Sequence, residues 1–145
     1  MNNHPYTALL RVLLCLALLT GMGAARADEP IKVVYQLSEE RLASQTMNNL
    51  ANHLSAEPGV KIVVVVISTG VRAFLFGGQD ATGRPYSEWV DQLAARGVEF
   101  RICQNSMSAM DVARSELIEG LHYVPSGMAE IARLQAREHY VYLRP

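Results

Sequence analysis

The sequence predicts a three-layer α/β/α fold around a mainly parallel five-stranded sheet. Short β-branched runs alternate along the chain with segments whose apolar residues recur at helical spacing. One run, VKIVVVVI at residues 60–67, is almost wholly apolar, which is typical of a strand buried on both faces of a parallel sheet. The 118 residues from 28 to 145 are enough for one domain with one core, and too few for two.

The first 27 residues have the layout of a cleavable export signal. Arg11 precedes an apolar run at 12–19, and Ala25-Arg26-Ala27 fits a signal-peptidase site. A membrane-spanning helix needs about 20 predominantly apolar residues, and Gly21, Gly23 and Arg26 interrupt this run too early. We therefore expect a signal peptide at 1–27, cleavage before Asp28, a periplasmic domain at 28–145 and no stable membrane anchor.

Charge and cysteine content narrow the function classes. Without Arg11 and Arg26, 11 of the 13 Lys and Arg remain against 14 Asp and Glu, and no basic stripe is present. Nucleic acid is therefore a poor partner. Cys15 follows Leu14 in the middle of the apolar run, so we expect an apolar filler there. Cys103 is then the single cysteine of the domain, although exported proteins usually pair their cysteines.

The elements of the first half follow from the apolar pattern. Residues 31–37 (IKVVYQL) predict a strand, and Ser38 is placed to cap a helix with Glu39 and Glu40 in its first turn. That helix places four apolar residues on one face and ends at Pro58-Gly59. The four are Ala43, Met47, Leu50 and Leu54. The strand at 60–67 follows, and Ser68-Thr69-Gly70 closes it.

The middle of the chain contains the longest loop. An apolar turn at 71–76 (VRAFLF) enters a polar, glycine-containing stretch at 77–85, for which we expect a mobile surface loop. A helix from Tyr86 to Ala94 packs Trp89 into the core, and Gly97 stops it. Residues 98–102 (VEFRI) predict the next strand, which ends at Cys103.

The last third repeats the alternation. Ser106 or Ser108 is expected to start a helix, the latter with Asp111 in a capping-box-like position. Residues 122–124 predict a short strand and 139–143 a last one. Between them, Ser126 caps a helix whose apolar face carries Met128, Ile131 and Leu134.

Four segments fall at the carboxyl ends of the predicted strands, where ligands of α/β proteins bind. They begin at Ser38, Ser68, Cys103 and Pro125. The candidate site residues from these segments are Ser68, Thr69, Gly70, Cys103, Gln104, Asn105, Ser106, Ser126 and Gly127.

Two interpretations of Cys103 stay open. A thiol just before a helix N-terminus has its thiolate stabilised, and the side chains of Gln104, Asn105 and Ser106 can donate hydrogen bonds to a thiolate or persulfide. Arg101 adds positive charge only if it turns inward. Alternatively, Cys103 is a buried small apolar residue, as free cysteines often are.

Other chemistry is poorly supported. His53, His122 and His139 lack metal-ligand spacing, so we expect no metal. Ser68-Thr69-Gly70 lacks the P-loop lysine and the GxGxxG pattern, and no other cofactor motif is present. No CxxC exists, which excludes dithiol exchange within one chain.

Several separated segments resemble the DsrE/DsrF-like family, which includes sulfur-relay subunits of the TusD type. They are KVVYQLSE at 32–39, NNLANHL at 48–54, RGVEFRICQNSM at 96–107 and VPSGMAEIARLQ at 124–135, with YVYLRP at the end. The resemblance implies a three-layer domain with five parallel strands, assembled as a trimer or hexamer. It also implies that Cys103, which follows Gly97-Val98 as in a GVxxxxC-like strand, carries sulfur as a persulfide.

The chain departs from that family in two ways. Many relatives have a His-Gly pair where Ser68-Thr69-Gly70 stands here, so any role of that histidine is absent. The better-understood relay members work in the cytoplasm, whereas this chain carries an export signal, so its donor and acceptor differ from theirs. The apolar VRAFLF segment at 71–76 is the expected contact between copies.

The sequence therefore predicts a periplasmic sulfur carrier or sulfurtransferase-like protein with Cys103 as the nucleophile. Its partners would be other copies of the chain and sulfur donors and acceptors. The alternative is a non-catalytic oligomeric module that binds a small ligand and keeps Cys103 buried as a structural residue. Thiol reactivity separates the two, because a carrier needs an accessible sulfur of low pKa.

Overall fold

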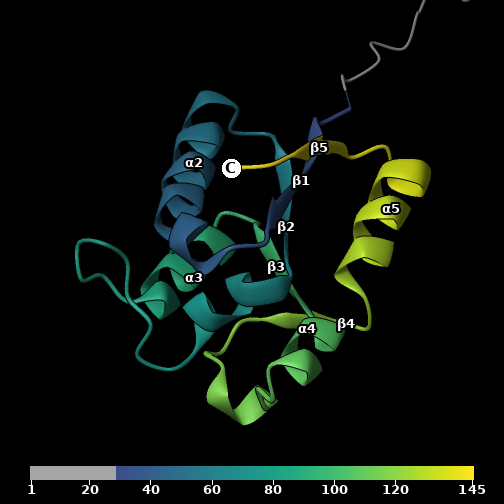
Figure 1. Ribbon diagram of the computed structural model, residues 1–145. Helices are drawn as coiled ribbons and strands as arrows, with labels where there is room; N and C mark the ends of the chain where they lie inside the picture. The colour runs from purple at the N-terminus through teal and green to yellow at the C-terminus, as the bar shows by residue number, and fades with distance from the viewer. Residues whose placement is uncertain (1–28) are drawn as a thin grey trace, which may run out of the picture.

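The computed structural model describes residues 29–145 as five parallel strands with helices on both faces of the sheet (Figure 1). The strands are β1 (Lys32–Leu37), β2 (Lys61–Val66), β3 (Glu99–Cys103), β4 (His122–Val124) and β5 (Val141–Leu143). Their order in the sheet is β4-β3-β2-β1-β5, and every neighbouring pair is parallel. The predicted fold class is confirmed.

The strand order determines which helices cover which face. The chain steps from β1 to β2 to β3 in one direction and returns across the sheet from β4 to β5. Because crossovers between parallel strands are right-handed, the forward steps and the return lie on opposite faces. The helices α2 (Ala43–Ala56) and α3 (Tyr86–Ala94) accordingly lie on one side of the sheet, and α5 (Gly127–Glu138) lies on the other (Figure 1).

The face under α2 and α3 carries the larger core. Val33, Tyr35 and Leu37 of β1 point to it, as do alternate residues of β2 and β3. Phe74 lies fully buried between the rings of Phe100 and Tyr86, at centroid distances of 5.8 and 6.2 Å. The predicted helix face is confirmed, since Ala43, Met47, Leu50 and Leu54 are all buried in this cluster.

The opposite face is covered by α5 alone. A second, smaller cluster lies here and consists of Val34 of β1, Val63 and Val65 of β2, Ile67, Cys103, and Ile131 and Leu134 of α5. Central strand β2 is therefore buried on both sides from Ile62 onward, as the apolar run predicted. Met128 does not join this core, and its side chain is exposed because it lies on the outer side of the helix.

Two helix starts differ from the sequence prediction, and a third agrees with it. Ser38 caps no helix, because its carbonyl accepts hydrogen bonds from the segment after β2, and a short 3-10 turn at Glu40–Leu42 precedes α2 instead. The helix α4 (Gln104–Ala109) begins directly after Cys103, which leaves Ser106 inside it and Ser108 near its end. A Ser126 cap of α5 was predicted correctly, since its hydroxyl accepts from the Ala129 N–H at 3.4 Å.

The segment 71–76 is mostly part of the core. Residues Ser68–Phe74 form a 3-10 helix with Val71, Ala73 and Phe74 buried, so Phe76 is the only largely exposed apolar residue of the segment. A second short 3-10 turn, Arg114–Glu116, lies between α4 and β4.

The loop at 77–85 is held by one carboxylate. Asp80 accepts hydrogen bonds from the Thr82 backbone and hydroxyl, from the Arg84 N–H and from the Trp89 indole. These bonds hold the pKa of Asp80 well below its ordinary value. Trp89 is buried as predicted, and Arg84 stacks over its ring at 4.0 Å.

The predicted signal peptide at 1–27 and its cleavage before Asp28 lie outside the described residues. Within residues 29–145, every helix is too short or too polar to cross a membrane.

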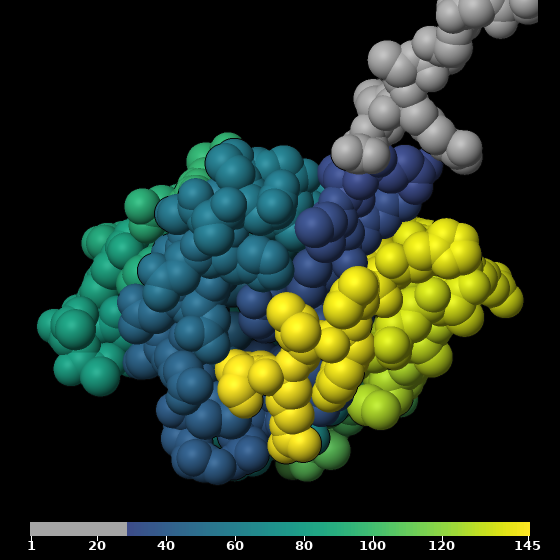
Figure 2. All heavy atoms as spheres, turned by 90° about the horizontal axis from the view of Figure 1, so that it is seen from above, coloured from purple at the N-terminus to yellow at the C-terminus, as the bar shows by residue number. Residues whose placement is uncertain are grey.

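Seen from above, α5 and β5 lie together beside β1, and α2 lies on the other side of β1 (Figure 2).

Candidate functional site

Cys103 lies where β3 ends and α4 begins, at the carboxyl edge of the sheet. It is the last residue of β3 and stands at the N-cap position of α4. Its side chain belongs to the cluster under α5, and only 5 % of the residue is exposed. Cys103 is the only free cysteine in the part of the chain that the structure describes.

The starts of α4 and α5 both lie against Cys103 and influence the pKa of its thiol. Burial is the largest single influence on its pKa and raises it. The Ser106 hydroxyl and the backbone N–H groups of Gly127, Ser106 and Asn105 act against burial by hydrogen-bonding to the thiolate. Their combined effect is larger, so the pKa of Cys103 lies below its ordinary value.

Gly127 allows α5 to start in direct contact with the thiol. A Cβ atom on Gly127 would lie 2.3 Å from Ile67 Cγ2 and 3.2 Å from Cys103 Cβ. A side chain at this position would therefore push the first turn of α5 away from the sheet. Glycine is needed here for a close approach that brings its own N–H to the sulfur.

Ser106 connects the thiol to the end of β2. Its Oγ accepts the backbone N–H of Ser68 at 2.8 Å, which leaves the hydroxyl hydrogen free to donate to the sulfur. Ser68 adopts a left-handed backbone with φ of 48°, which a non-glycine residue adopts only when its surroundings hold it there. The bond from Ser68 to Ser106 is one such contact.

The other predicted residues have different roles. Thr69 and Gly70 donate hydrogen bonds to the Ser38 carbonyl at 3.3 Å each, so they join the ends of β1 and β2 and do not contact the thiol. The Asn105 N–H donates to the Pro125 carbonyl at 3.3 Å and also helps to lower the pKa of Cys103, while the Asn105 side chain is exposed. The side chain of Gln104 makes no hydrogen bond within residues 29–145.

An ion-pair network that sequence reasoning missed lies beside the thiol. Arg101 of β3 pairs with Glu99 at 2.6 Å and with Glu130 of α5, and Glu130 also pairs with Arg133 at 2.7 Å. Arg101 does turn inward, with 17 % of its side chain exposed, but toward carboxylates rather than the sulfur. The pairing of residues 29 positions apart leaves no signal in one sequence.

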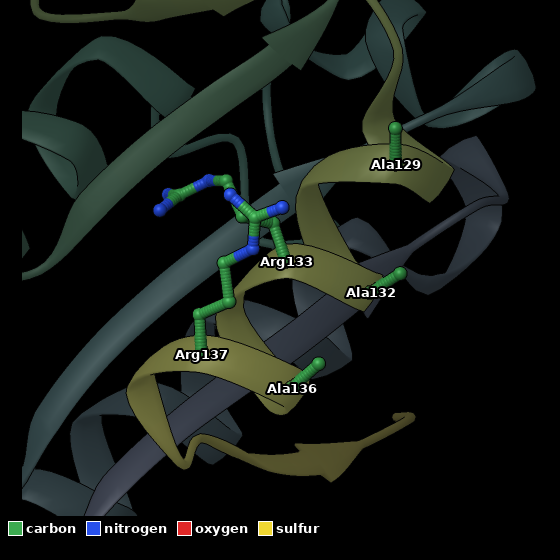
Figure 3. Close-up of a pocket in the computed structure, with 5 residues that line it drawn as sticks. All are labelled: Ala129, Ala132, Arg133, Ala136 and Arg137. Atoms are coloured by element: carbon green, nitrogen blue, oxygen red, sulfur yellow. The ribbon is translucent and has the colours of Figure 1, made fainter.

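The outer side of α5 bears a shallow hollow that does not include Cys103. Ala129, Ala132 and Ala136 form its floor, and Arg133 and Arg137 rise along one side (Figure 3). Within residues 29–145, no group of three or more His, Cys, Asp or Glu side chains is placed to hold a metal ion.

Comparison with known protein families identifies the family of the chain. A family model described as the DsrE/DsrF-like family matches residues 32–143, which includes all five strands. The chain belongs to the DsrE/DsrF-like family. Membership relates it in general terms to sulfur relay.

Two solved structures share the fold of this DsrE/DsrF-like protein. MTH1491 of Methanobacterium thermoautotrophicum, a protein of unknown function, is 32 % identical with a TM-score of 0.68, covering 79 % of this chain and 99 % of that one. The YchN protein of E. coli is 18 % identical with a TM-score of 0.59, covering 81 % and 99 %. No curated protein matches the chain.

Proposed function

We propose that this DsrE/DsrF-like protein is a periplasmic sulfur carrier that holds sulfur as a persulfide on Cys103. The observation that carries the proposal is the position of Cys103 at the end of β3, against the starts of α4 and α5, where the Ser106 hydroxyl and nearby backbone N–H groups lower the pKa of its thiol. Such a cradle stabilises negative charge, and both a thiolate and a persulfide are anions at neutral pH.

The chemistry is thiol exchange. With thiosulfate as donor, the Cys103 thiolate attacks the outer sulfur, the sulfur–sulfur bond of thiosulfate breaks, and sulfite leaves with the bonding electron pair. A Cys103 persulfide anion remains. A partner thiolate then attacks its outer sulfur, takes it as a new persulfide and regenerates the Cys103 thiolate. Each step conserves charge and needs no outside oxidant or cofactor.

Partners and location belong to the same proposal. The carrier acts in the periplasm after loss of residues 1–27, between a sulfane sulfur donor and an acceptor thiol. It assembles as a trimer or hexamer, and the contact between copies includes the exposed ring of Phe76 rather than the whole 71–76 segment.

One observation favours the alternative of a binding module with a structural cysteine. Only 5 % of Cys103 is exposed, and the residue belongs to the same buried cluster under α5 as Val65, Ile67 and Ile131. A structural thiol of this kind resists alkylation until the protein unfolds.

Mass spectrometry of the loaded protein separates the two functions. Reduced full-length protein is incubated with thiosulfate or polysulfide and digested, and the peptide containing Cys103 is weighed. A carrier gains about 32 Da, one sulfur atom, which dithiothreitol removes. Cys103→Ser abolishes the adduct, while Cys15→Ser serves as the matched control and keeps it.

The contrary result is equally clear. If the Cys103 peptide gains no dithiothreitol-reversible mass and the native thiol resists iodoacetamide at about pH 7 until urea unfolds the protein, Cys103 is structural. Cys103→Ser conserves volume closely, so the variant is expected to keep the fold and to give a valid baseline.

A further inference from the structure

The ion pairs beside Cys103 are more enclosed than the other ion pairs at the surface. Glu130 keeps only 11 % of its side chain exposed and binds two guanidinium groups, Arg101 and Arg133. Both hold the pKa of Glu130 below its ordinary value despite its burial. Arg133 also pairs with Glu138, near the end of α5. The network thus fastens α5 to β3 at one point, through Arg101 and Glu130.

The Arg101–Glu130 pair lies close to the thiol along both β3 and α5. Arg101 precedes Cys103 by two positions on β3, so both side chains leave the same face of the sheet. Glu130 follows Gly127 by three positions, so the two are neighbours on one side of the first turn of α5. Contacts therefore close a ring: Cys103 to Arg101 along the strand, Arg101 to Glu130, Glu130 to Gly127 along the helix, and Gly127 back to Cys103, whose Cβ lies 3.2 Å from where a Gly127 Cβ would stand.

We propose that Glu130 is a positioning residue of the thiol site: bound to Arg101, it holds the first turn of α5 so that the Gly127 N–H donates to Cys103. Glu130 does not itself bond to the sulfur. The biological role of this positioning rests on the proposed function, because a sulfur carrier needs the thiolate that the Gly127 N–H stabilises. The ring itself is independent of any sulfur donor.

The sign of the effect distinguishes positioning from direct electrostatics. Glu130 is negative, so its removal acting only through space would favour the nearby thiolate and lower the pKa of Cys103. Removal that frees the first turn of α5 weakens the Gly127 hydrogen bond and raises that pKa. The other charges of the network are Glu99 and Arg101 on β3 and Arg133 and Glu138 on α5, and the Tyr140 hydroxyl lies within their field.

The test is a pH titration of thiolate absorbance near 240 nm in Glu130→Ala and in the unsubstituted full-length chain. Subtracting the same titration of Cys103→Ser removes the contributions of tyrosines and of Cys15. We expect the midpoint to move to higher pH in Glu130→Ala. Glu130→Gln should lie between the two, because its amide oxygen still accepts from Arg101.

Glu99→Gln is the matched control. Glu99 pairs with the same Arg101, but it lies on β3 with 48 % of its side chain exposed and does not fasten α5. Its removal changes the charge around Arg101 equally, and we expect the midpoint to stay or to fall. A midpoint that falls or stays in Glu130→Ala overturns the proposal. Should that variant not fold, the titration of Glu130→Gln against Glu99→Gln decides.

A failed sulfur-loading experiment leaves this result unaffected, since the titration measures ionisation without a donor. A raised midpoint with no sulfur adduct would keep the positioning role and reject the carrier. A sulfur adduct with an unmoved midpoint would keep the carrier and reject the positioning role.

Discussion

The two faces of the sheet are built from the same strands and differ in what covers them. Beneath α2 and α3 lies the larger cluster, with Phe74, Phe100 and Leu50 fully buried. Beneath α5 lies a smaller cluster that ends at Cys103 and borders the Arg101–Glu130 ion pair. The first face is apolar and supplies stability, whereas the second combines a thiol, N–H donors and charges. On the second face the start of α5 lies beside Cys103 at the end of β3. On the first face, side chains of the larger core fill the space under α2 and α3.

The largest effect tests the stabilising face. Phe74→Ala removes a fully buried ring between Phe100 and Tyr86, and we expect a loss of about 3–5 kcal/mol in the free energy of unfolding, measured in urea. The thiolate titration of Cys103 should stay unchanged while the protein is folded. A large shift of that titration would show that the two faces are coupled and would break the comparison.

A smaller effect on stability, with a larger effect on the thiol, is expected on the other face. In Gly127→Ala the added Cβ meets Ile67 Cγ2 at 2.3 Å, so the first turn of α5 must move. Overpacking of this kind costs about 1–3 kcal/mol. The shift carries the N–H of residue 127 away from the thiol. We therefore expect the pKa of Cys103 to rise and its alkylation at neutral pH to become slower. Gly59→Ala is the control, because no atom lies within 4 Å of its new Cβ, and it should leave both measurements nearly unchanged.

The smallest effect is a pH dependence that belongs to the loop at 77–85. The pKa of Asp80 is lowered in the folded protein from an ordinary 3.8, so its hydrogen bonds stabilise the fold above that value. This stabilisation is lost as pH falls toward the folded-state pKa. Unfolding in urea should show the chain more stable than Asp80→Asn at about pH 7, with the difference shrinking progressively below about pH 5. A difference that is constant with pH would contradict this account.

Much of the fold could be predicted because its strands, helix faces and caps depend on residues that are neighbours in the sequence. The apolar run of β2, the face from Ala43 to Leu54 and the cap at Ser126 each follow from a few neighbouring residues. The helix after β3 was placed wrongly because serines are favoured caps, yet Cys103 itself stands at that position. Met128 was placed in the core because α5 is amphipathic on average, and a single position on its boundary is not resolved by spacing.

The sequence predicted which of the candidate residues lie together, but not the contacts that they make. Strand ends of a parallel sheet meet at one edge, which identified Cys103, Ser106 and Gly127 together. The pKa of Cys103 is lowered by the Ser106 hydroxyl and by backbone N–H groups rather than by the side-chain amides of Gln104 and Asn105, and nothing in the identity of Asn105 shows this. The partner of Arg101 lies 29 positions away, so only the folded chain reveals it.

The ring around Cys103 forms only after α5 has packed on the sheet. Its donors come from residues near 105 and from Gly127, within the last third of the sequence, and α5 reaches them only by the final crossover of the sheet. Docking of α5 also joins it to β1, where Lys32 donates to the Glu138 carbonyl 106 positions away, and loops of that length are costly to close. A nascent chain that has not yet docked α5 therefore carries an ordinary thiol. The lowered pKa of Cys103 is therefore a property of the completed domain, because it needs the starts of both α4 and α5 in place.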